Sequence, residues 1–315
     1  MFTKNFFRGL ALLCGLSGAP AHAQIELRFV TWKSEAPEVW QQAIADFERH
    51  NPGVKVVSEI GPQSSTQLHD LLTQKLRNRD TRLDVFVMDV IWPAEFASAG
   101  WALPLDRYLG AAERQKFLAA PLSANEYRGQ LFGLPLFIDA GLLYYRKDLL
   151  EKYRLQPPRT WPQLVEHAKT ILAREKDPRL VGFSAQFKQY EGLVCNMMEY
   201  IVGNGGALWD EASMTSALHQ PAALAAVRFV RDRIVGEIAH RGVLAYEEPE
   251  SLALFTQGQA IFHRNWPYAW AAANDVPEIV TWTQTGNEGM RALNERLGYR
   301  YRSGIVSVRA PLPLR

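Results

Sequence analysis

Aromatic and acidic side chains come together at three places where a strand is expected to end or a loop to lie. These are the pairs Asp89/Trp92 and Phe137/Asp139 and the run Asn265-Trp266-Pro267-Tyr268-Ala269-Trp270. A sugar ring has an apolar face and a rim of hydroxyl groups. Proteins hold such a ring by stacking Trp or Tyr on the face while acidic, amide and guanidinium groups hydrogen-bond the rim. The chemistry that these residue types support is noncovalent recognition of a carbohydrate.

The same residues have ordinary structural interpretations. Asp89 and Asp139 are of a type that caps helices and forms turns. The indole rings of Trp92 and Trp266 suit a hydrophobic core. Glu38 suits the first turn of a helix, where the helix dipole favours a negative charge. Residue type alone leaves both interpretations open for each position.

Enzymatic motifs are absent from the sequence. It contains no P-loop, no G-x-S-x-G, no H-E-x-x-H and no Cys/His cluster with metal-ligand spacing. Paired carboxylates decide nothing, because a chain with 33 acidic residues contains many candidate pairs. We therefore expect no catalytic residue, no metal and no cofactor. A net charge of +2 argues against a nucleic-acid partner.

The N-terminus has the pattern of a secretory signal peptide. Lys4 and Arg8 precede an apolar stretch, and small residues end in Ala21-His22-Ala23, which predicts cleavage before Gln24 and export to the periplasm. The apolar stretch is too short to span a bilayer. Removing residues 1–23 from 315 leaves 292, enough for two domains. Cys195 is then the single cysteine, expected to be buried and inert.

The mature chain begins with alternating strand and helix patterns. Apolar alternation and helical spacing predict a strand at 25–30, a helix at 38–49, a strand at 54–57, a helix at 66–76 and a strand at 84–88. The last is a nearly unbroken apolar run, typical of a strand buried on both faces. This order indicates βαβ units and a largely parallel sheet, with ligands outside the carboxyl ends of the strands. Asp89 and Trp92 fall at such an end.

A second half begins near residues 137–145 and continues mainly as helices. Helical patterns cover residues 161–173, 191–202, 221–235 and 249–257. The prediction is an α/β protein of two lobes, residues 24–137 and 138–275, joined by a crossover near Phe137 to Gly141.

Several stretches, in order, resemble the extracellular solute-binding proteins of family 1, the maltose-binding-protein class, and its trehalose/maltose-binding branch in particular. They lie at 47–56, 84–92, 100–101, 138–150, 188–195, 255–260 and 264–270. The resemblance implies a type II, maltose-binding-like periplasmic-binding-protein fold whose two lobes close on a sugar without performing chemistry. It implies a soluble monomer that delivers the sugar to the membrane permease of an ABC importer.

The resemblance also implies ligand contacts. Asp89 matches an acidic contact after the buried strand, Asp139 and Phe137 match contacts at the crossover, and Trp266 matches a stacking aromatic. Phe137 stands where the branch often has Tyr, which removes one hydroxyl. An arginine often found in the second helix is not evident. Three further positions complete the expected ligand-binding set: Glu38, Trp92 and Tyr268.

The resemblance ends near Asn274-Asp275, which predicts an incomplete second lobe. Residues 276–315 contain a run, Val280 to Tyr299, that resembles the last strand–helix–strand of GNAT-type acetyltransferases. The Gly-rich loop that would hold the coenzyme A pyrophosphate is absent upstream. The segment is therefore expected to be a foreign tail, the product of a truncation and fusion, without acetyltransferase activity of its own.

The function expected from the sequence is capture of a sugar, an α-linked disaccharide such as trehalose or maltose. Two alternatives stay open: a truncated fusion product without function, and an enzyme, either through the acetyltransferase-like tail or as an unrecognised glycosidase.

Overall fold

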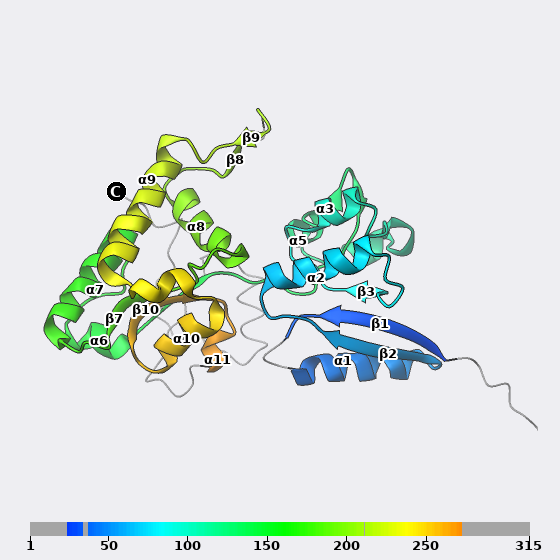
Figure 1. The fold of residues 1–315 in the computed structure, drawn as a ribbon, viewed down its shortest axis with the longest axis horizontal. Helices are drawn as coiled ribbons and strands as arrows, with labels where there is room; N and C mark the ends of the chain where they lie inside the picture. The colour runs from blue at the N-terminus through cyan, green and yellow to red at the C-terminus, as the bar shows by residue number, and fades with distance from the viewer. Residues whose placement is uncertain (1–23, 34–36, 211, 273–315) are drawn as a thin grey trace, which may run out of the picture. The chain divides into compact units, whose positions relative to one another are not determined.

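The computed structural model describes residues 24–33, 37–210 and 212–272, which form two compact units (Figure 1). The first unit comprises the described residues up to Gln63 together with Gln67–Asp89. The second comprises Ser64–Thr66 and the described residues from Val90 onward. The predicted lobe boundary at residue 137 lies within the second unit. The predicted signal peptide and the predicted GNAT-like tail lie outside the described residues.

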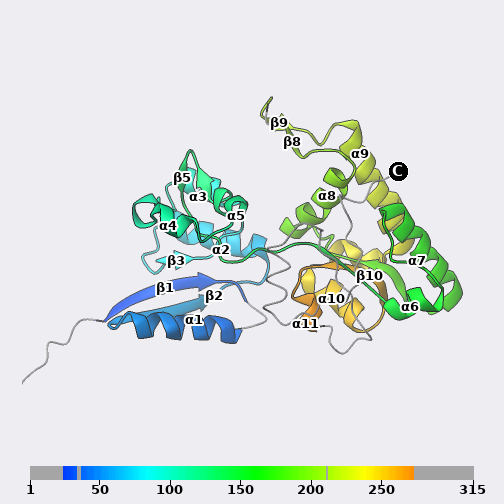
Figure 2. The ribbon, with the colours of Figure 1, turned by 180° about the vertical axis from the view of Figure 1, so that it is seen from behind.

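The first unit is a three-stranded parallel sheet between two helices. Strand β1 lies between β2 and β3, with Ile25 opposite Val54 and Phe29 opposite Val85. Figures 1 and 2 show α1 on one face of this sheet and α2 on the other. The elements follow the predicted order: β1 Ile25–Thr31, α1 Pro37–His50, β2 Val54–Ile60, α2 Ser65–Arg77 and β3 Val85–Phe86. The predicted parallel βαβ arrangement is confirmed.

The turn between α1 and β2 explains why these elements lie together. Gly53 has φ of 95°, in the left-handed region that favours glycine. Glu48, in the last turn of α1, accepts hydrogen bonds from the backbone N–H of Val56 (2.8 Å) and from Lys55 Nζ (2.9 Å). These two bonds hold the pKa of Glu48 below its ordinary value and fix the helix to the strand.

Strand β3 is shorter and more exposed than predicted. The sequence predicted a strand at 84–88 buried on both faces, but β3 has two residues and Val85 is 49% exposed. Among the described residues, β3 is an edge strand that pairs with β1 alone. Before β3, the Asp84 carboxylate accepts from the backbone N–H of Arg28 at 2.8 Å, where a backbone carbonyl would accept in a longer ladder. An apolar run signals burial, but it does not reveal an edge position.

The second unit contains the remaining elements, including a second three-stranded sheet. In this sheet β10 lies between β6, to which it is antiparallel, and β7, to which it is parallel. The first part of the second unit consists of α3 Pro93–Ser98, η1 Asp106–Tyr108, α4 Ala111–Arg114, α5 Ala119–Ser123, β4 Glu126–Tyr127, β5 Gln130–Leu131 and β6 Leu142–Tyr145. Its middle consists of α6 Lys147–Lys152, α7 Trp161–Glu175, β7 Val181–Ser184, α8 Glu191–Gly203, β8 Trp209–Asp210 and β9 Thr215–Ser216. It continues with α9 Pro221–Phe229, η2 Val230–Ile238, η3 Arg241–Ala245, α10 Glu248–Thr256, β10 Ala260–Asn265 and α11 Ala269–Ala272.

The core of the second unit surrounds β10, all six residues of which are buried. Trp161 of α7 packs its ring on Tyr200 of α8 (centroids 4.2 Å apart) and edge-on to Phe183 of β7 (6.1 Å). Such aromatic packing contributes dispersion and burial together. The core therefore holds β10 rigidly, and the residues that follow this strand leave it at a defined position.

The predicted helix at 221–235 changes type within its length. The α-helix ends at Phe229 and a π-helix continues over Val230–Ile238. Residues four apart lie on one face of a helix. Val230, Ile234 and Ile238 are all buried against the core. Hydrophobic spacing in the sequence does not reveal the change of helix type, because the same residues would share a face in an α-helix.

Thr160 caps the longest helix of the second unit. Its Oγ1 accepts from the backbone N–H of Gln163 at 3.1 Å, and the Gln163 side chain accepts from the backbone N–H of Arg159 at 2.7 Å. Thr160→Ala is expected to lower the free energy of unfolding by about 1 kcal/mol, since an N-cap hydrogen bond is lost. Chemical denaturation measures this change. Thr170→Ala is the control, because its hydroxyl bonds only within α7 (to Glu166 O, 2.8 Å), and a loss as large as that of Thr160→Ala would contradict the capping role.

Candidate functional site

Trp266 directly follows β10, and protein groups contact its backbone, its indole N–H and one face of its ring. Its backbone N–H donates to Asn265 Oδ1 (2.8 Å), and its carbonyl accepts from the Tyr144 hydroxyl (2.9 Å). Its indole N–H donates to Glu248 Oε1 at 3.1 Å. The Arg264 guanidinium lies 3.8 Å from the ring centroid, a cation–π contact. One face of the indole is thus occupied by Arg264, while the residue as a whole stays partly exposed.

Glu248 joins Trp266 to a second aromatic residue. Located at the start of α10, its Oε1 also accepts from the Tyr190 hydroxyl at 2.7 Å. The helix N-terminus favours the negative charge of this carboxylate. Desolvation, with the charge of Glu248 beside it, raises the pKa of Tyr190 well above its ordinary value, so the phenol stays a hydrogen-bond donor. The carboxylate therefore fixes two rings from two different elements.

A buried ion pair supports the Arg264 guanidinium. Arg264 is 2% exposed, and its Nε and Nη2 both donate to Glu199 Oε1, at 3.0 and 2.5 Å. Its Nη1 donates to Gln186 Oε1 at 3.3 Å. Two close contacts from a planar guanidinium to a carboxylate restrain its orientation. The plane on which the indole rests is thus set by residues of α8 and the segment after β7.

Asp139 and Gly141 bring the chain before β6 to this ion pair. A Cβ at residue 141 would collide with the ends of the Glu199 and Arg264 side chains, so this close approach requires glycine. Asp139 keeps accessible surface, but surrounding protein desolvates its carboxyl group. This desolvation raises the pKa of Asp139 to about 6, against the opposing effects of a hydrogen bond from the backbone N–H of Ala140 and the charge of Arg264.

The raised pKa of Asp139 predicts a pH dependence of stability. Between pH 4 and 6 the folded protein holds a proton that the unfolded chain has released, so ionisation of this group destabilises the fold as pH rises. Asp139→Asn removes this effect. We expect the variant to gain stability relative to the wild type from pH 4 to pH 6.5, measured by urea unfolding at each pH.

Asp210→Asn is the control for the Asp139 prediction. Backbone N–H groups of Ser213 and Ala212 lower the pKa of Asp210. The ionised carboxylate therefore stabilises the fold at pH values above the pKa that this group has in the unfolded chain. The control variant should therefore be less stable than the wild type by an amount that stays nearly constant from pH 5 to pH 6.5, because Asp210 is ionised there in both the folded and the unfolded chain. A relative stability of Asp139→Asn that stays constant across this range would contradict the prediction.

The second unit brings some of the predicted site residues together and buries one of them. The Trp266 ring lies against the Arg264 guanidinium, and the charge of the same guanidinium acts on the Asp139 carboxyl group. Tyr268 is half-buried, and Phe137 is 59% exposed. Trp92 is 5% exposed and stacks on Phe96 with centroids 6.0 Å apart. The structure therefore favours the core interpretation of Trp92, because little of its ring is left to stack on a sugar.

Asp89 and Glu38 lie in the first unit. Asp89 is half-buried and follows β3 at the carboxyl edge of the parallel sheet, as predicted. Glu38 is exposed in the first turn of α1, a position where the helix dipole also favours it. Trp32 follows β1 at the same sheet edge, and its ring meets that of Trp40 at 5.6 Å.

The ligand-binding residues predicted from the sequence did not include Arg264, Glu199 or Glu248. The alternation of β10 carried a usable signal, since Arg264 and Trp266 are two residues apart and point the same way. Glu199 and Glu248 are distant in sequence and gave none. Cys195 was expected to be buried, but it is half-buried, and its thiol donates to Glu191 Oε1 at 2.7 Å.

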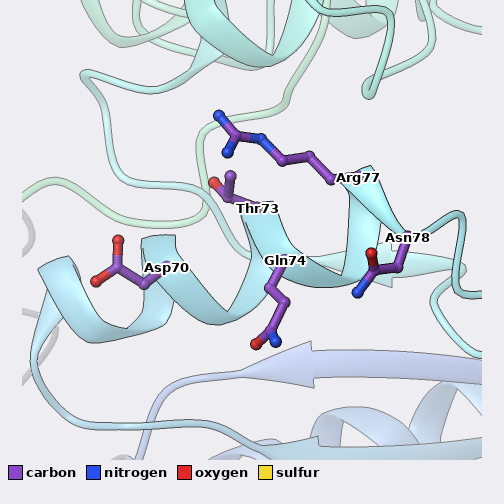
Figure 3. Close-up of a pocket in the computed structure, with 5 residues that line it drawn as sticks. All are labelled: Asp70, Thr73, Gln74, Arg77 and Asn78. Carbon is purple, nitrogen blue, oxygen red and sulfur yellow. The ribbon is translucent and has the colours of Figure 1, made fainter.

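An open depression on the first unit does not have the character of the predicted site. Figure 3 shows the side chains that line it along α2. Among them are charged and amide groups but no aromatic ring, and none belongs to the predicted set: Asp70, Thr73, Gln74, Arg77 and Asn78. This depression therefore does not correspond to the predicted stacking site.

Two further observations concern the described part of the chain alone. None of its helices combines the length and the apolar character needed to cross a bilayer. Within the same residues, no three His, Cys, Asp or Glu side chains are grouped so as to bind a metal ion.

Residues 32–292 match the family described as bacterial extracellular solute-binding proteins. This match covers most of the chain, and the chain belongs to that family, which consists of binding proteins rather than enzymes. The match extends past Asn274-Asp275, where the resemblance was expected to end, and into the segment predicted to be a foreign tail.

Individual relatives agree with this assignment. A probable ABC transporter-binding protein of Deinococcus radiodurans is 36% identical over 67% of this chain and 50% of its own length. A putative binding protein of Brucella abortus is 29% identical over 80% of this chain and 59% of its own. Maltose-bound MalE3 of T. maritima is 36% identical with a TM-score of 0.75, covering 82% of this chain and 66% of MalE3. The chain thus spans about half to two thirds of the length of these relatives. The expected maltose-binding-like α/β fold is confirmed.

Proposed function

We propose that this chain captures a sugar for an ABC importer and that the free face of Trp266 is the platform on which the sugar ring stacks. The observation that carries this proposal is the fixed indole itself. Its backbone, its N–H and one face all have protein partners, while the residue stays partly exposed. A ring held in this way loses little entropy when it binds a ligand, which favours affinity.

The polar groups around this indole suit a hydroxylated ligand. Glu248 accepts through one carboxylate oxygen from both Tyr190 and Trp266, so its second oxygen is available to a sugar hydroxyl. Asp139 adds a carboxyl group beside Arg264. We also propose Glu38, Asp89, Phe137 and Tyr268 as residues that contact the ligand.

We further propose an α-linked disaccharide, trehalose or maltose, as the ligand. The support is the 36% identity to maltose-bound MalE3 of T. maritima. Structures with bound ribitol, from Agrobacterium radiobacter, and bound D-mannitol, from Agrobacterium vitis, are 22% and 21% identical and share the fold alone. The protein would act in the periplasm as a monomer and deliver the sugar to a membrane permease.

Thermal melting with a ligand panel tests this function. A ligand that binds only the folded state stabilises it by about 2.7 kcal/mol at a concentration of 100 Kd, and so raises the melting temperature. We expect trehalose or maltose to raise it and mannitol and ribitol to leave it unchanged. A shift with a polyol alone would overturn the disaccharide assignment. A cooperative melt that none of the four shifts would overturn the proposed function.

A further inference from the structure

His263 and Asn265 form a buried hydrogen-bonded chain that ends at the backbone of Trp266. His263 Nδ1 lies 3.1 Å from the carbonyl oxygen of Ser184, and His263 Nε2 lies 3.0 Å from Asn265 Nδ2. Asn265 Oδ1 then accepts from the Trp266 N–H at 2.8 Å. Ser184, His263 and Asn265 are each 0% exposed. These three residues are therefore shielded from bulk water.

The two ends of the chain fix the proton positions within it. A carbonyl oxygen only accepts, so Nδ1 of His263 must carry the proton that Ser184 O accepts. A backbone N–H only donates, so the oxygen of the Asn265 amide must face Trp266 and its NH2 must face His263. The NH2 group donates, so Nε2 of His263 must accept. All three bonds form together only with a neutral imidazole protonated at Nδ1.

We propose that His263, as this neutral tautomer, is a positioning residue that holds Trp266 in place for the ligand through Asn265. This inference rests on the proposed function of Trp266. A proton on Nε2 would face the Asn265 NH2 group. A turn of the amide to accept it would direct the NH2 group at the Trp266 N–H. Either change breaks the bond that sets where the indole leaves β10.

The surroundings of His263 keep the ring neutral. Its ring stacks on Phe255 of α10 with centroids 5.1 Å apart and lies 6.1 Å from the ring of Tyr144 of β6, the titratable group on that strand that faces it. Arg264, the next residue on β10, is the charged neighbour. Desolvation, with the charge of Arg264 in the same direction, lowers the pKa of His263 to about 3, and the Ser184 carbonyl opposes this only in part.

The variant Asn265→Asp tests the chain through a pH profile. The substitution keeps an acceptor for the Trp266 N–H but sets a carboxylate oxygen against Nε2 of neutral His263. The two acceptors repel until His263 takes a proton. We expect the Kd of this variant for maltose or trehalose to be about tenfold weaker at pH 8 than at pH 5. The wild type should change less than twofold between the same pH values.

Asn204→Asp is the matched control, since the Asn204 amide also donates to a protein acceptor, the carbonyl of Ala222 at 2.8 Å, but lies outside this chain. Its Kd should have no comparable pH dependence. A profile of Asn265→Asp that is as flat as that of the wild type, with wild-type affinity, would overturn the positioning role. So would an equal pH dependence in the control variant.

A second measurement is independent of ligand binding. Nitrogen NMR of 15N-histidine-labelled wild-type protein, with His263→Gln to assign the resonance, should find neutral His263 protonated at Nδ1 from pH 5 to pH 8. A ring protonated at Nε2, or one that titrates near pH 6.5, would overturn the proposal even if Asn265→Asp does not fold. If the tautomer is as expected but no sugar binds the wild type, the proposed function fails, and with it the role of His263 in binding.

Discussion

Trp266→Ala is expected to weaken disaccharide binding by about 30-fold or more. Loss of a central aromatic contact at a binding site costs about 2 kcal/mol or more, which corresponds to this factor. The indole at this position is already oriented by Glu248, Arg264 and Asn265, so the free protein pays little to present it. Isothermal titration calorimetry with the disaccharide that raises the melting temperature measures the change in Kd.

Two further variants make the Trp266 result specific. Trp209→Ala removes an indole that is 50% exposed on β8 and should leave Kd within twofold of the wild-type value. Trp266→Phe keeps an aromatic face but loses the hydrogen bond to Glu248, and its Kd should fall between those of the wild type and Trp266→Ala. If Trp266→Ala, with a wild-type melting temperature, binds as tightly as Trp209→Ala, the stacking assignment is wrong.

Glu199→Gln is expected to lower the free energy of unfolding by about 2 kcal/mol. The guanidinium of Arg264 is buried and would lose its charged partner, and breaking a buried pair from one side costs about 3 to 5 kcal/mol. The Glu199 side chain is 33% exposed, so solvent screens part of the interaction and we expect a smaller value. Chemical denaturation at pH 7 measures the loss.

An exposed ion pair in the same unit provides the control for Glu199. Arg233 Nη2 and Glu166 Oε1 lie 2.7 Å apart, but their side chains are 39% and 61% exposed. Glu166→Gln should therefore change the free energy of unfolding by less than about 0.5 kcal/mol. If the two variants lost equal stability, burial of Arg264 would not be what makes its pair with Glu199 important.

The sequence predicted helices and strands closely where the spacing of the hydrophobic residues was regular. Alternation at residues 25–30 and helical spacing at 38–49 predicted the positions of β1 and α1 closely. Position within a sheet was not available from the same pattern. The apolar run at β3 is typical of a central strand, yet β3 is an edge strand. Which strands assemble beside it decides its pairing.

Residue types and spacing predicted an α/β fold, and the family resemblance of the sequence predicted the class of this protein and the residues of its candidate site. They indicated an α/β binding protein, and they placed Asp139 and Trp266 where a ligand is expected. Tertiary structure alone decided what each side chain does. Trp92 and Trp266 are the same residue type, yet Trp92 is buried and stacks on Phe96. Trp266 instead makes a cation–π contact with Arg264 and donates a hydrogen bond to Glu248. The physical reason is that partners such as Glu199 and Glu248 are far from residue 266 in sequence. Only packing around β10 brings them into contact, and only contact sets burial, proton position and charge.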